Sequence, residues 1–323
     1  MSNIDISLDM GMGALKLYGP GGGVQMPTQV AQAVKKTVGQ IAGLSRQRRP
    51  IHIECADGSF YTGAGAHDWG RPIESLDFDR LTSPEMRAMI YATLTLCMKN
   101  TPLDAPINLT CGLPIQVMGD DASVGAIVRN FLKGEHHWRA DGHDHSAVVD
   151  KVKIAPQAVG ALFDYLIPED EIDLQRAEIA KGEVGIISCG FNTVELMATR
   201  NMALIQRFTN GSTSGVRRLL ELLNPQNLYS LGEMDAMLRA NNLPYAAAIP
   251  TWMREVQGSV NNVWGDSWQR FNLVLIVGGG ALLLGKSRLE SMFPGKVHVP
   301  DDPVLSIARG LYKLAKQQVQ RKS

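Results

Sequence analysis

The sequence predicts an α/β protein built from two related halves. Short apolar strands alternate with amphipathic helices along all 323 residues. A strand, a glycine turn and a second strand occur at residues 4–18, and the same order recurs at 182–200. A third apolar strand at 273–277 runs directly into three glycines. A pattern repeated about half a chain apart indicates an internal duplication, with one hairpin in each half.

The first hairpin carries the motif ISLDMGMGALK at residues 6–16. Asp9 is expected where the apolar strand of residues 4–8 runs into a turn. Gly11 and Gly13 can adopt positive φ and allow a ligand to approach the backbone closely. Backbone N–H groups beside one carboxylate suit a phosphate and its divalent metal. On this stretch alone, an ordinary hairpin with glycines at its turn remains the alternative.

The rest of the N-terminal half predicts a series of alternating elements. Ser83 as a cap and Pro84 at the first helical position indicate where the longest of its helices begins. The predicted series is a glycine loop at 20–27, an amphipathic helix at 28–41, a hairpin at 51–63, a helix at 83–99, a strand at 105–115 and a helix at 121–134 ended by Gly134.

The second half predicts a similar alternation. It consists of a polar hairpin at 135–154, a helix at 155–168, a strand–turn–strand at 182–200, helices at 212–223, 233–242 and 251–264, a strand running into glycines at 271–285, and an edge strand, turn and terminal helix at 296–318. The polar hairpin carries four histidines, which are His136, His137, His143 and His145. Their spacing follows no known ligand pattern, so a solvated hairpin is favoured over a metal site.

Composition excludes several classes of protein. The chain is 45% hydrophobic and 20% charged, without an apolar run long enough to span a bilayer. Lysine plus arginine balance aspartate plus glutamate at 32 each, which argues against broad nucleic-acid binding. The first residues contain no basic region typical of a signal peptide. Cys55, Cys97, Cys111 and Cys189 lack CxxC spacing, as expected of reduced thiols. We therefore expect a soluble cytoplasmic protein.

The glycine motifs are not the common nucleotide-binding fingerprints. Neither GxxxxGK[ST] nor GxGxxG is present, which excludes the P-loop and dinucleotide motifs. In this order and spacing, ISLDMGMGALK, VGIISCGFNTVE and LVLIVGGGALL resemble the phosphate-1, phosphate-2 and adenosine motifs of the actin superfamily. DPVLSIARGLYKLAK resembles the last helix of ParM/StbA-type plasmid-segregation actins and of archaeal actin-like proteins. The resemblance covers nearly the whole chain.

The resemblance implies a fold and its domains. The fold would be actin-like (ribonuclease-H-like), with duplicated α/β domains around a nucleotide cleft. Domain I would comprise residues 1–155 and 300–323, and domain II residues 156–299. The helix at 155–168 would be the hinge, so closure on a nucleotide would move Gln157 toward the γ-phosphate.

The resemblance also implies roles for residues of the first hairpin and the hinge. Asp9 would hold Mg²⁺ through water, and the turn from Gly11 through Met12 to Gly13 would wrap the β- and γ-phosphates. Lys16 would reach toward the phosphates, although a surface lysine is the alternative. Gln157 would orient the attacking water, and the alternative is a glutamine that caps its own helix.

The second hairpin and the glycine run complete the implied nucleotide site. The binding residues of the phosphate-2 turn would be Ser188, Gly190, Asn192 and Thr193. Gly278, Gly279 and Gly280 would let the adenosine and α-phosphate lie against bare backbone near a helix N-terminus, with a tight strand–helix turn as the alternative.

Two residues depart from the family pattern. Ser188 stands where the phosphate-2 motif usually has an aspartate, which removes one negative charge, although Glu195 keeps the motif's last acid. Met12 stands where actin has a serine near the γ-phosphate. We therefore expect nucleotide binding to survive and turnover to be slow or lost.

Three functions remain open. The favoured one is a cytomotive filament for plasmid or DNA segregation that binds and slowly hydrolyses ATP with Mg²⁺. Its partners would be further copies of itself and a DNA-bound adaptor, with no direct contact to nucleic acid or membrane. The alternatives are a non-polymerising nucleotide-binding scaffold and a small-molecule kinase of the same fold. The sequence does not decide between ATP and GTP.

Overall fold

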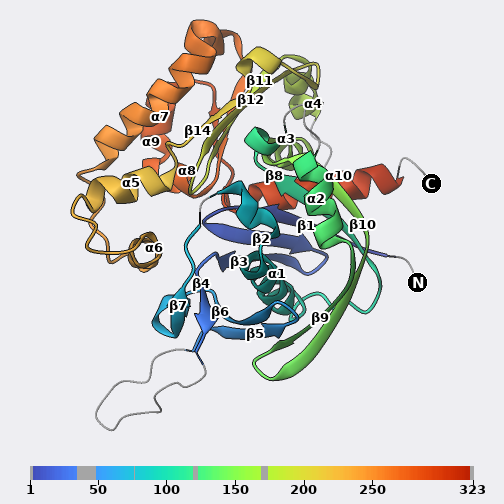
Figure 1. Ribbon diagram of the computed structural model, residues 1–323. Helices are drawn as coiled ribbons and strands as arrows, with labels where there is room; N and C mark the ends of the chain where they lie inside the picture. The colour runs from blue at the N-terminus through green and yellow to red at the C-terminus, as the bar shows by residue number, and fades with distance from the viewer. Residues whose placement is uncertain (1–2, 35–48, 76, 119–122, 169–173, 321–323) are drawn as a thin grey trace.

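The chain folds into two lobes, each built on a β-sheet (Figure 1). The computed structural model describes residues 3–34, 49–75, 77–118, 123–168 and 174–320. Within these ranges, the larger sheet comes almost entirely from the N-terminal half, and the smaller sheet from the C-terminal half. No helix in the described ranges is long and apolar enough to cross a membrane.

The larger sheet begins with the predicted first hairpin. Its strands, in spatial order, are β3 (Gly22–Pro27), β2 (Ala14–Gly19), β1 (Ile4–Met10), β8 (Ile107–Leu113), β10 (His143–Pro156), β9 (Gly134–Ala140), β5 (Ile51–Cys55), β6 (Gly58–Thr62), β4 (Val30–Ala33) and β7 (Gly70–Pro72). β1 pairs antiparallel with β2 and parallel with β8, and β8 pairs parallel with β10. The carboxyl ends of these three parallel strands therefore meet at one edge, where Asp9 lies.

The smaller sheet repeats this arrangement. Its strands are β13 (Ala203–Leu204), β12 (Val194–Arg200), β11 (Glu183–Cys189), β15 (Leu273–Val277) and β16 (Val297–His298), and β14 (Asn210–Ser212) pairs with β12. β11 pairs antiparallel with β12 and parallel with β15, as β1 does with β2 and β8. The shared pairing pattern supports the predicted duplication.

Helices cover both sheets. They are α1 (Pro84–Cys97), α2 (Ser123–Leu132), α3 (Gln157–Leu166), α4 (Leu174–Lys181), α5 (Val216–Leu223), α6 (Leu231–Arg239), α7 (Ile249–Trp264), α8 (Gly279–Leu284), α9 (Lys286–Met292) and α10 (Ser306–Gln320). Short 3-10 turns occur at Ala66–Asp68, Phe78–Thr82, Ile115–Val117, Gln206–Phe208 and Gly265–Arg270. Ser83 caps α1 as predicted, because its side chain accepts a hydrogen bond from the Met86 N–H.

Two predictions in the first half are wrong. The glycine-rich stretch at 20–27 is not a loop, since Gly22–Pro27 forms β3 and pairs with β2. Val30–Ala33, expected in a helix, forms β4 between β6 and β7. Residues 35–41 of that predicted helix lie outside the described residues. The apolar residues recur here at helical spacing, but the stretch forms a strand because it pairs with β6 and β7, which come later in the chain.

The predicted hairpin at 135–154 forms as β9 and β10, but its histidines do not converge on a common point. His136 is buried and bonds the Tyr91 hydroxyl at 3.1 Å and the Leu132 carbonyl at 2.9 Å. His145 stacks on Trp138 instead. Within the described ranges, no group of three or more His, Cys, Asp or Glu side chains could hold a metal. These side chains are thus explained by packing and by solvent exposure.

The two lobes meet at α3 and α10. The two helices pack together over buried Leu162 and Leu311, which share a core with Ile186 of β11 and Leu275 of β15. α10 also packs against β1, where the Ser7 hydroxyl donates to the Ala308 carbonyl at 2.6 Å. The last helix therefore packs both on the first strand of the larger sheet and on the core of the second half of the chain.

Candidate functional site

A cavity of about 430 Å³ lies between the two glycine turns. It is lined by Asp9, Gly11, Met12, Gly13, Lys16, Gln157, Ser188, Gly190, Asn192, Thr193, Gly278 and Gly279, all of which the sequence had singled out. Gly280 is the exception, because its α-carbon lies against the Cys189 side chain and leaves no room for a Cβ. Gly280 therefore permits close packing behind the cavity and does not line it.

Asp9 is the centre of a buried polar network. It is 1% exposed and lies within β1, one residue before the strand ends. Lys16 donates to its Oδ2 at 3.0 Å, and Gln157 donates to its Oδ1 at 2.5 Å. Lys16 comes from β2 and Gln157 from the first residue of α3, so three elements converge on one carboxylate. This position also places the lysine inward, which spacing alone had left open.

The first glycine turn, from Gly11 to Gly13, lines the cavity. The Met12 and Gly13 carbonyls accept hydrogen bonds from Thr28, at 2.5 Å from its hydroxyl and 3.2 Å from its N–H. In the described part of the chain, no group accepts a hydrogen bond from the N–H of Gly11, Met12 or Gly13. Free N–H groups at a tight turn form a concave site for an anion.

The second turn faces the first. Gly190 N–H donates to the Thr193 carbonyl at 2.9 Å, and the first N–H groups of α5 donate to the Gly190 and Phe191 carbonyls. A Cβ on Gly13 would collide with the Phe191 side chain, so the two turns touch directly. Gly278 follows β15 and lies against the residue before the second turn, with φ at +92° and its α-carbon against the Cys189 carbonyl. This close approach requires glycine at 13 and 278.

The acid of the second hairpin, Glu195, lies behind the cavity. It is 1% exposed, and its Oε1 accepts a hydrogen bond from the Ile115 N–H at 3.1 Å, while Oε2 is buried without a partner among the described groups. Burial raises the pKa of Glu195 to about 8, and the nearby Asp9 charge adds to the shift. Glu195 therefore joins the two lobes at neutral pH as a largely protonated side chain.

Sequence reasoning missed the part of the cavity that α6 supplies. Asp235 and Arg239 form an ion pair at 2.7 Å, and Arg239 also donates to the Gly13 carbonyl at 3.2 Å. Burial raises the pKa of Asp235, against the opposing effect of Arg239. The signal in the sequence is an i, i+4 acid–base pair, which surface helices also carry. Leu238, Asn241 and Tyr245 line the same side.

The lobes are also connected beyond the turns. Gln29 Nε2 donates to the Gly232 carbonyl at 2.9 Å, and Glu74 Oε1 accepts from the Gly232 N–H at 3.1 Å. A second cavity of about 450 Å³ lies beside these contacts and shares Met12, Gly13, Phe191 and Asp235 with the first. The first turn of α6 therefore closes the cleft on the side away from α3 and α10.

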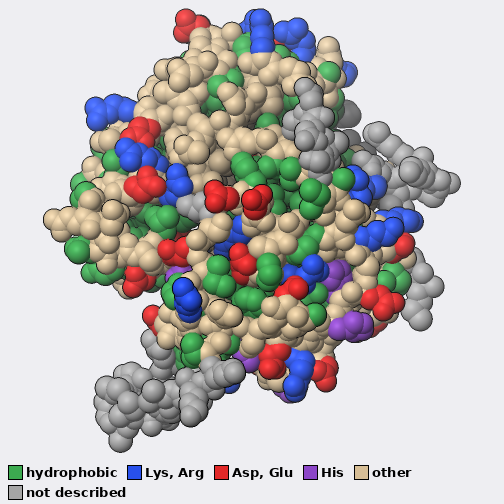
Figure 2. Space-filling model, viewed as in Figure 1, with side chains coloured by type: hydrophobic (Ala, Val, Ile, Leu, Met, Phe, Trp, Pro, Cys, Tyr) green, Lys and Arg blue, Asp and Glu red, His purple; other side chains and the backbone are tan. Residues whose placement is uncertain are grey.

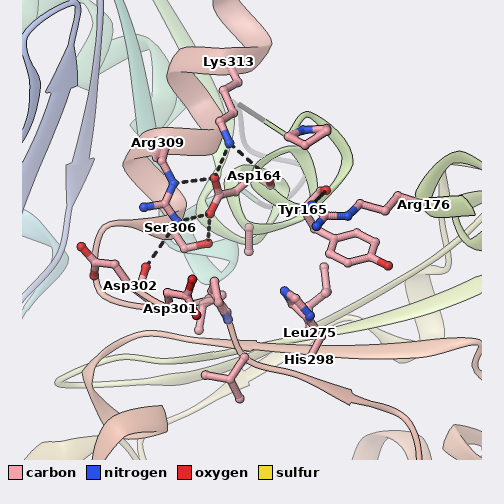
Figure 3. A pocket seen from close by; sticks show the side chains of 15 residues that line it. Asp164, Tyr165, Arg176, Leu275, His298, Asp301, Asp302, Ser306, Arg309 and Lys313 are labelled. Atoms are coloured by element: carbon pink, nitrogen blue, oxygen red, sulfur yellow. Dashed lines mark hydrogen bonds and ion pairs between the residues drawn. The ribbon is translucent and has the colours of Figure 1, made fainter. Parts of the chain in front are cut away.

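A third cavity, of about 410 Å³, lies at the α3–α10 junction (Figure 3). Asp164 of α3 points toward α10 and accepts hydrogen bonds from Ser306 at 2.7 Å, Arg309 at 2.6 and 2.7 Å, and Lys313 at 2.9 Å. Burial acts to raise the pKa of Asp164, but these hydrogen bonds outweigh it and lower the pKa. This network fixes α3, and with it Gln157, relative to the last helix.

Comparison with known proteins agrees with this geometry. Residues 7–160 match the family model described as the actin-like proteins N-terminal domain. The chain has an actin-like fold. No curated protein sequence matches it closely enough to be reported as a relative.

The actin-like chain is similar to solved structures along nearly its entire length. The apo pSK41 ParM protein has a TM-score of 0.74 and 16% identity, covering 99% of both chains. A 15-stranded ParM filament from Clostridium botulinum has a TM-score of 0.76 and 18% identity, covering 98% of this chain and 100% of that one. The archaeal actin homologue Ta0583 in complex with ADP has a TM-score of 0.72 and 17% identity, covering 97% and 99%. At these identities the likeness establishes the fold.

Proposed function

We propose that this actin-like protein binds ATP with Mg²⁺ in the cavity between its glycine turns, hydrolyses it slowly, and assembles into filaments that move plasmid or other DNA. The observation that carries the proposal is the pair of touching turns above a buried Asp9 held by Lys16 and Gln157. The N–H groups of the first turn suit a phosphate, and the second turn faces them from the other lobe. Nucleotide binding would therefore hold the lobes together.

The residues fit a metal that arrives with the nucleotide. Two carboxylates line the cavity: Asp9, which is held by Lys16 and Gln157, and Asp235, which is held by Arg239. Asp9 stands two residues before Gly11, at the start of the first glycine turn. The described residues offer no group of three acidic, histidine or cysteine ligands. Mg²⁺ is usually held through one or two carboxylates, phosphates and retained waters, which this donor set allows. When bound, the metal would neutralise phosphate charge, and Asp9 would hold its water shell.

The remaining residues take the following roles in the proposal. Gly11, Met12, Gly13 and Lys16 bind the terminal phosphates from one side, and Ser188, Gly190, Asn192 and Thr193 bind them from the other. Gly278 and Gly279 lie beneath the adenosine, with Gly280 packed behind them. Gln157 orients the attacking water through its amide, since a glutamine positions water without acting as a strong base.

The proposed domains are residues 1–155 with 300–323 and residues 156–299. Their junction at α3, the packing of α10 on β1, and the separate sheets support this division. Closure around α3 would bring Gln157 toward the phosphates. The partner beyond the filament itself would be a DNA-bound adaptor protein, and GTP remains a possible second nucleotide.

Sedimentation with and without ATP and Mg²⁺, followed by electron microscopy of the pellet, tests the proposal. We expect nucleotide-dependent filaments, and Asp9→Ala should abolish Mg²⁺-dependent ATP binding while the fold remains intact. Asp5→Ala is the matched control, because Asp5 lies on the same strand away from the cavity. Normal Mg²⁺-ATP binding by Asp9→Ala would contradict the site. Tight binding without assembly would favour the non-polymerising scaffold.

A further inference from the structure

His67 carries a buried imidazole at the boundary between the two lobes. It belongs to the 3-10 turn Ala66–Asp68 of the lobe with the larger sheet, and its side chain is 10% exposed. Both ring nitrogens are buried, and neither has a hydrogen-bond partner among the described residues. Buried polar groups are normally hydrogen-bonded, so an imidazole with two unpaired nitrogens requires an explanation. The ring lines the second cavity and not the nucleotide cavity.

The ring packs against α6 of the opposite lobe. A Cβ at position 232 would lie 2.3 Å from His67 Cε1 and 2.5 Å from Nδ1, so the ring contacts the Gly232 backbone directly. Gly232 is also the residue that Gln29 and Glu74 reach across the cleft. Opening the cleft at this point would therefore uncover the side of the ring that Gly232 now covers.

Glu74 connects the ring to the same backbone. Its Oε1 accepts the hydrogen bond from the Gly232 N–H at 3.1 Å and lies 3.8 Å from His67 Nδ1, which is too far for a hydrogen bond. A protonated ring carries an N–H on both nitrogens, and its Nδ1–H would compete with the Gly232 N–H for this one oxygen. Because Glu74 and His67 lie on the same lobe, their ion pair can form once the cleft opens.

Several charged groups face the ring, and their effects on its pKa differ in sign. Burial lowers the pKa of His67 below its ordinary value and outweighs the nearby acids, which raise it. The acids are Glu74, Glu233 and Asp68, and Arg80 acts with burial. The same cavity is lined by Asp77 and by Asp235, which is paired with Arg239, and the strands packed on this turn add Tyr61 of β6 and the exposed Arg71 of β7. The closed cleft therefore favours a neutral imidazole.

We infer that His67 is a pH switch on the closed cleft: protonation of its ring separates α6 from the opposite lobe at Gly232 and accelerates nucleotide exchange. A charged ring buried against Gly232 would lack a hydrogen-bond partner, which is costly. In the open cleft the same ring would reach water and the carboxylate of Glu74. The effect on exchange rests on the function proposed above, whereas the opening of the cleft does not.

The direction and size of the effect follow from the proton equilibrium. Closure is fully supported above the ordinary histidine pKa of about 6.5 and weakens as the pH falls through that value toward the lower pKa of the closed cleft. At about pH 5.5, a ring with the ordinary pKa is about 90% protonated, so opening gains by at most about 10-fold relative to about pH 7.5. Partial protonation in the closed cleft reduces this gain, and we expect about 3–10-fold.

The first test needs no nucleotide. Hydrogen exchange of the Gly232 amide, which donates to Glu74 across the cleft, reports opening at this point. The rate in the unsubstituted chain is divided by the rate in His67→Gln at the same pH, which cancels the intrinsic rate of exchange. This ratio should be about 3–10 times higher at about pH 5.5 than at about pH 7.5. His67→Phe keeps a ring against Gly232 without a proton site and should give the same result as His67→Gln.

His137 provides a matched control. Its Nε2 lies 3.8 Å from Glu135 Oε2, the same separation as between His67 and Glu74, but these two side chains are 74% and 76% exposed. Figure 2 shows histidine side chains on the surface over β9 and β10, away from the cleft. His137→Gln should therefore exchange at Gly232 like the unsubstituted chain at both pH values.

The second test measures release of a fluorescent ATP analogue with Mg²⁺ in the same variants. Between about pH 7.5 and about pH 5.5, release from the unsubstituted chain should accelerate about 3–10-fold more than release from His67→Gln. An exchange ratio at Gly232 that is equal at both pH values overturns the switch, even where ATP binds normally. A chain that shows the expected exchange ratio but never binds ATP retains the switch and contradicts the proposed nucleotide function, which is a different result.

Discussion

At the scale of single residues, Gln157 is the side chain whose role is most specific to hydrolysis. Its amide donates to Asp9 at 2.5 Å from the start of α3. We expect Gln157→Ala to slow ATP hydrolysis by on the order of 10²-fold and to change ATP affinity much less, because a water-orienting group acts only in the reaction. Single-turnover phosphate release and equilibrium binding measure the two effects. A variant with unchanged turnover would show that Gln157 only supports Asp9 and its helix.

For Ser188, in contrast, we predict a substitution that raises the rate of ATP hydrolysis. It lies 5% exposed on the cavity, paired across the hairpin with Glu195. If a carboxylate at 188 strengthens metal or water positioning, Ser188→Asp should raise ATP turnover at saturating Mg²⁺. The gain should shrink when Mg²⁺ is scarce, because the added charge needs the metal for balance. Phosphate release across a Mg²⁺ titration measures this. A variant equal to or slower than the wild type at every Mg²⁺ concentration contradicts it.

Glu195 predicts a dependence of stability on pH. Its pKa is raised to about 8 in the folded chain, so folding takes up a proton between the ordinary pKa and that value. The contribution of Glu195 to the free energy of unfolding therefore falls as the pH rises through this window. Glu195→Gln keeps an acceptor for Ile115 and removes the titration.

The variant should gain Tm relative to wild type between about pH 5 and pH 8. The gain should reach at least about 2 °C, the shift that 1 kcal/mol produces in a domain of 150–250 residues. Exposed Glu178→Gln serves as the control and should leave the pH profile unchanged. Parallel profiles for Glu195→Gln and wild type would show that Glu195 is ionised in the folded chain.

At the scale of elements, the α3–α10 junction depends on one buried acid. Asp164→Asn would leave Arg309 and Lys313, both largely buried, without their counter-charge. Breaking a buried pair of this kind costs about 3–5 kcal/mol, whereas an exposed pair costs at most about 1 kcal/mol. Urea denaturation should show this difference between Asp164→Asn and the exposed Glu178→Gln. A loss of less than about 1 kcal/mol would show that α3 and α10 are held by apolar packing alone.

Most elements could be predicted from the sequence, because local signals and final contacts agree there. The Ser83 cap, the glycine turns and the long apolar run before Gly278 each specify a local conformation. The helix predicted over residues 28–34 is wrong because the local pattern and the final contacts disagree there. Val30 and Ala31 are both buried, and β4 pairs with β6 and β7, which come later in the chain at residues 58–62 and 70–72.

The candidate site shows the same division. Asp9 and Lys16 could be anticipated because both stand in the first glycine motif, whereas Gln157 could be anticipated only from the resemblance to the actin superfamily. The contribution of α6 could not, since Asp235 and Arg239 reach the first turn only after the lobes have come together. A single sequence contains no local signal for contacts between residues 226 positions apart.

At the scale of the whole molecule, closure of the cleft depends on few direct bonds. Gln29 and Glu74 reach Gly232 from the opposite lobe. A neutral hydrogen bond contributes about 0.5–1.5 kcal/mol, so Gln29→Ala should accelerate nucleotide release by about 2–10-fold. Displacement of a fluorescent ATP analogue in a stopped-flow instrument measures this rate. Gln32→Ala, at a neighbouring exposed position, is the control, and equal rates for the two variants would contradict a role of Gln29 in closure.

The packing of α10 on β1 has a consequence for synthesis on the ribosome. Ser7 bonds to Ala308, Tyr18 contacts the ring of Tyr312, and Leu311 packs against Gly112. The strands that are translated first are therefore covered only after residues 306–320 have been made. Lobes usually fold in order of translation, but here the first one keeps an uncovered apolar face until nearly the whole chain has been made. A nascent chain stalled before residue 300 should remain sensitive to protease in its N-terminal half, whereas release of the last helix should protect both halves together.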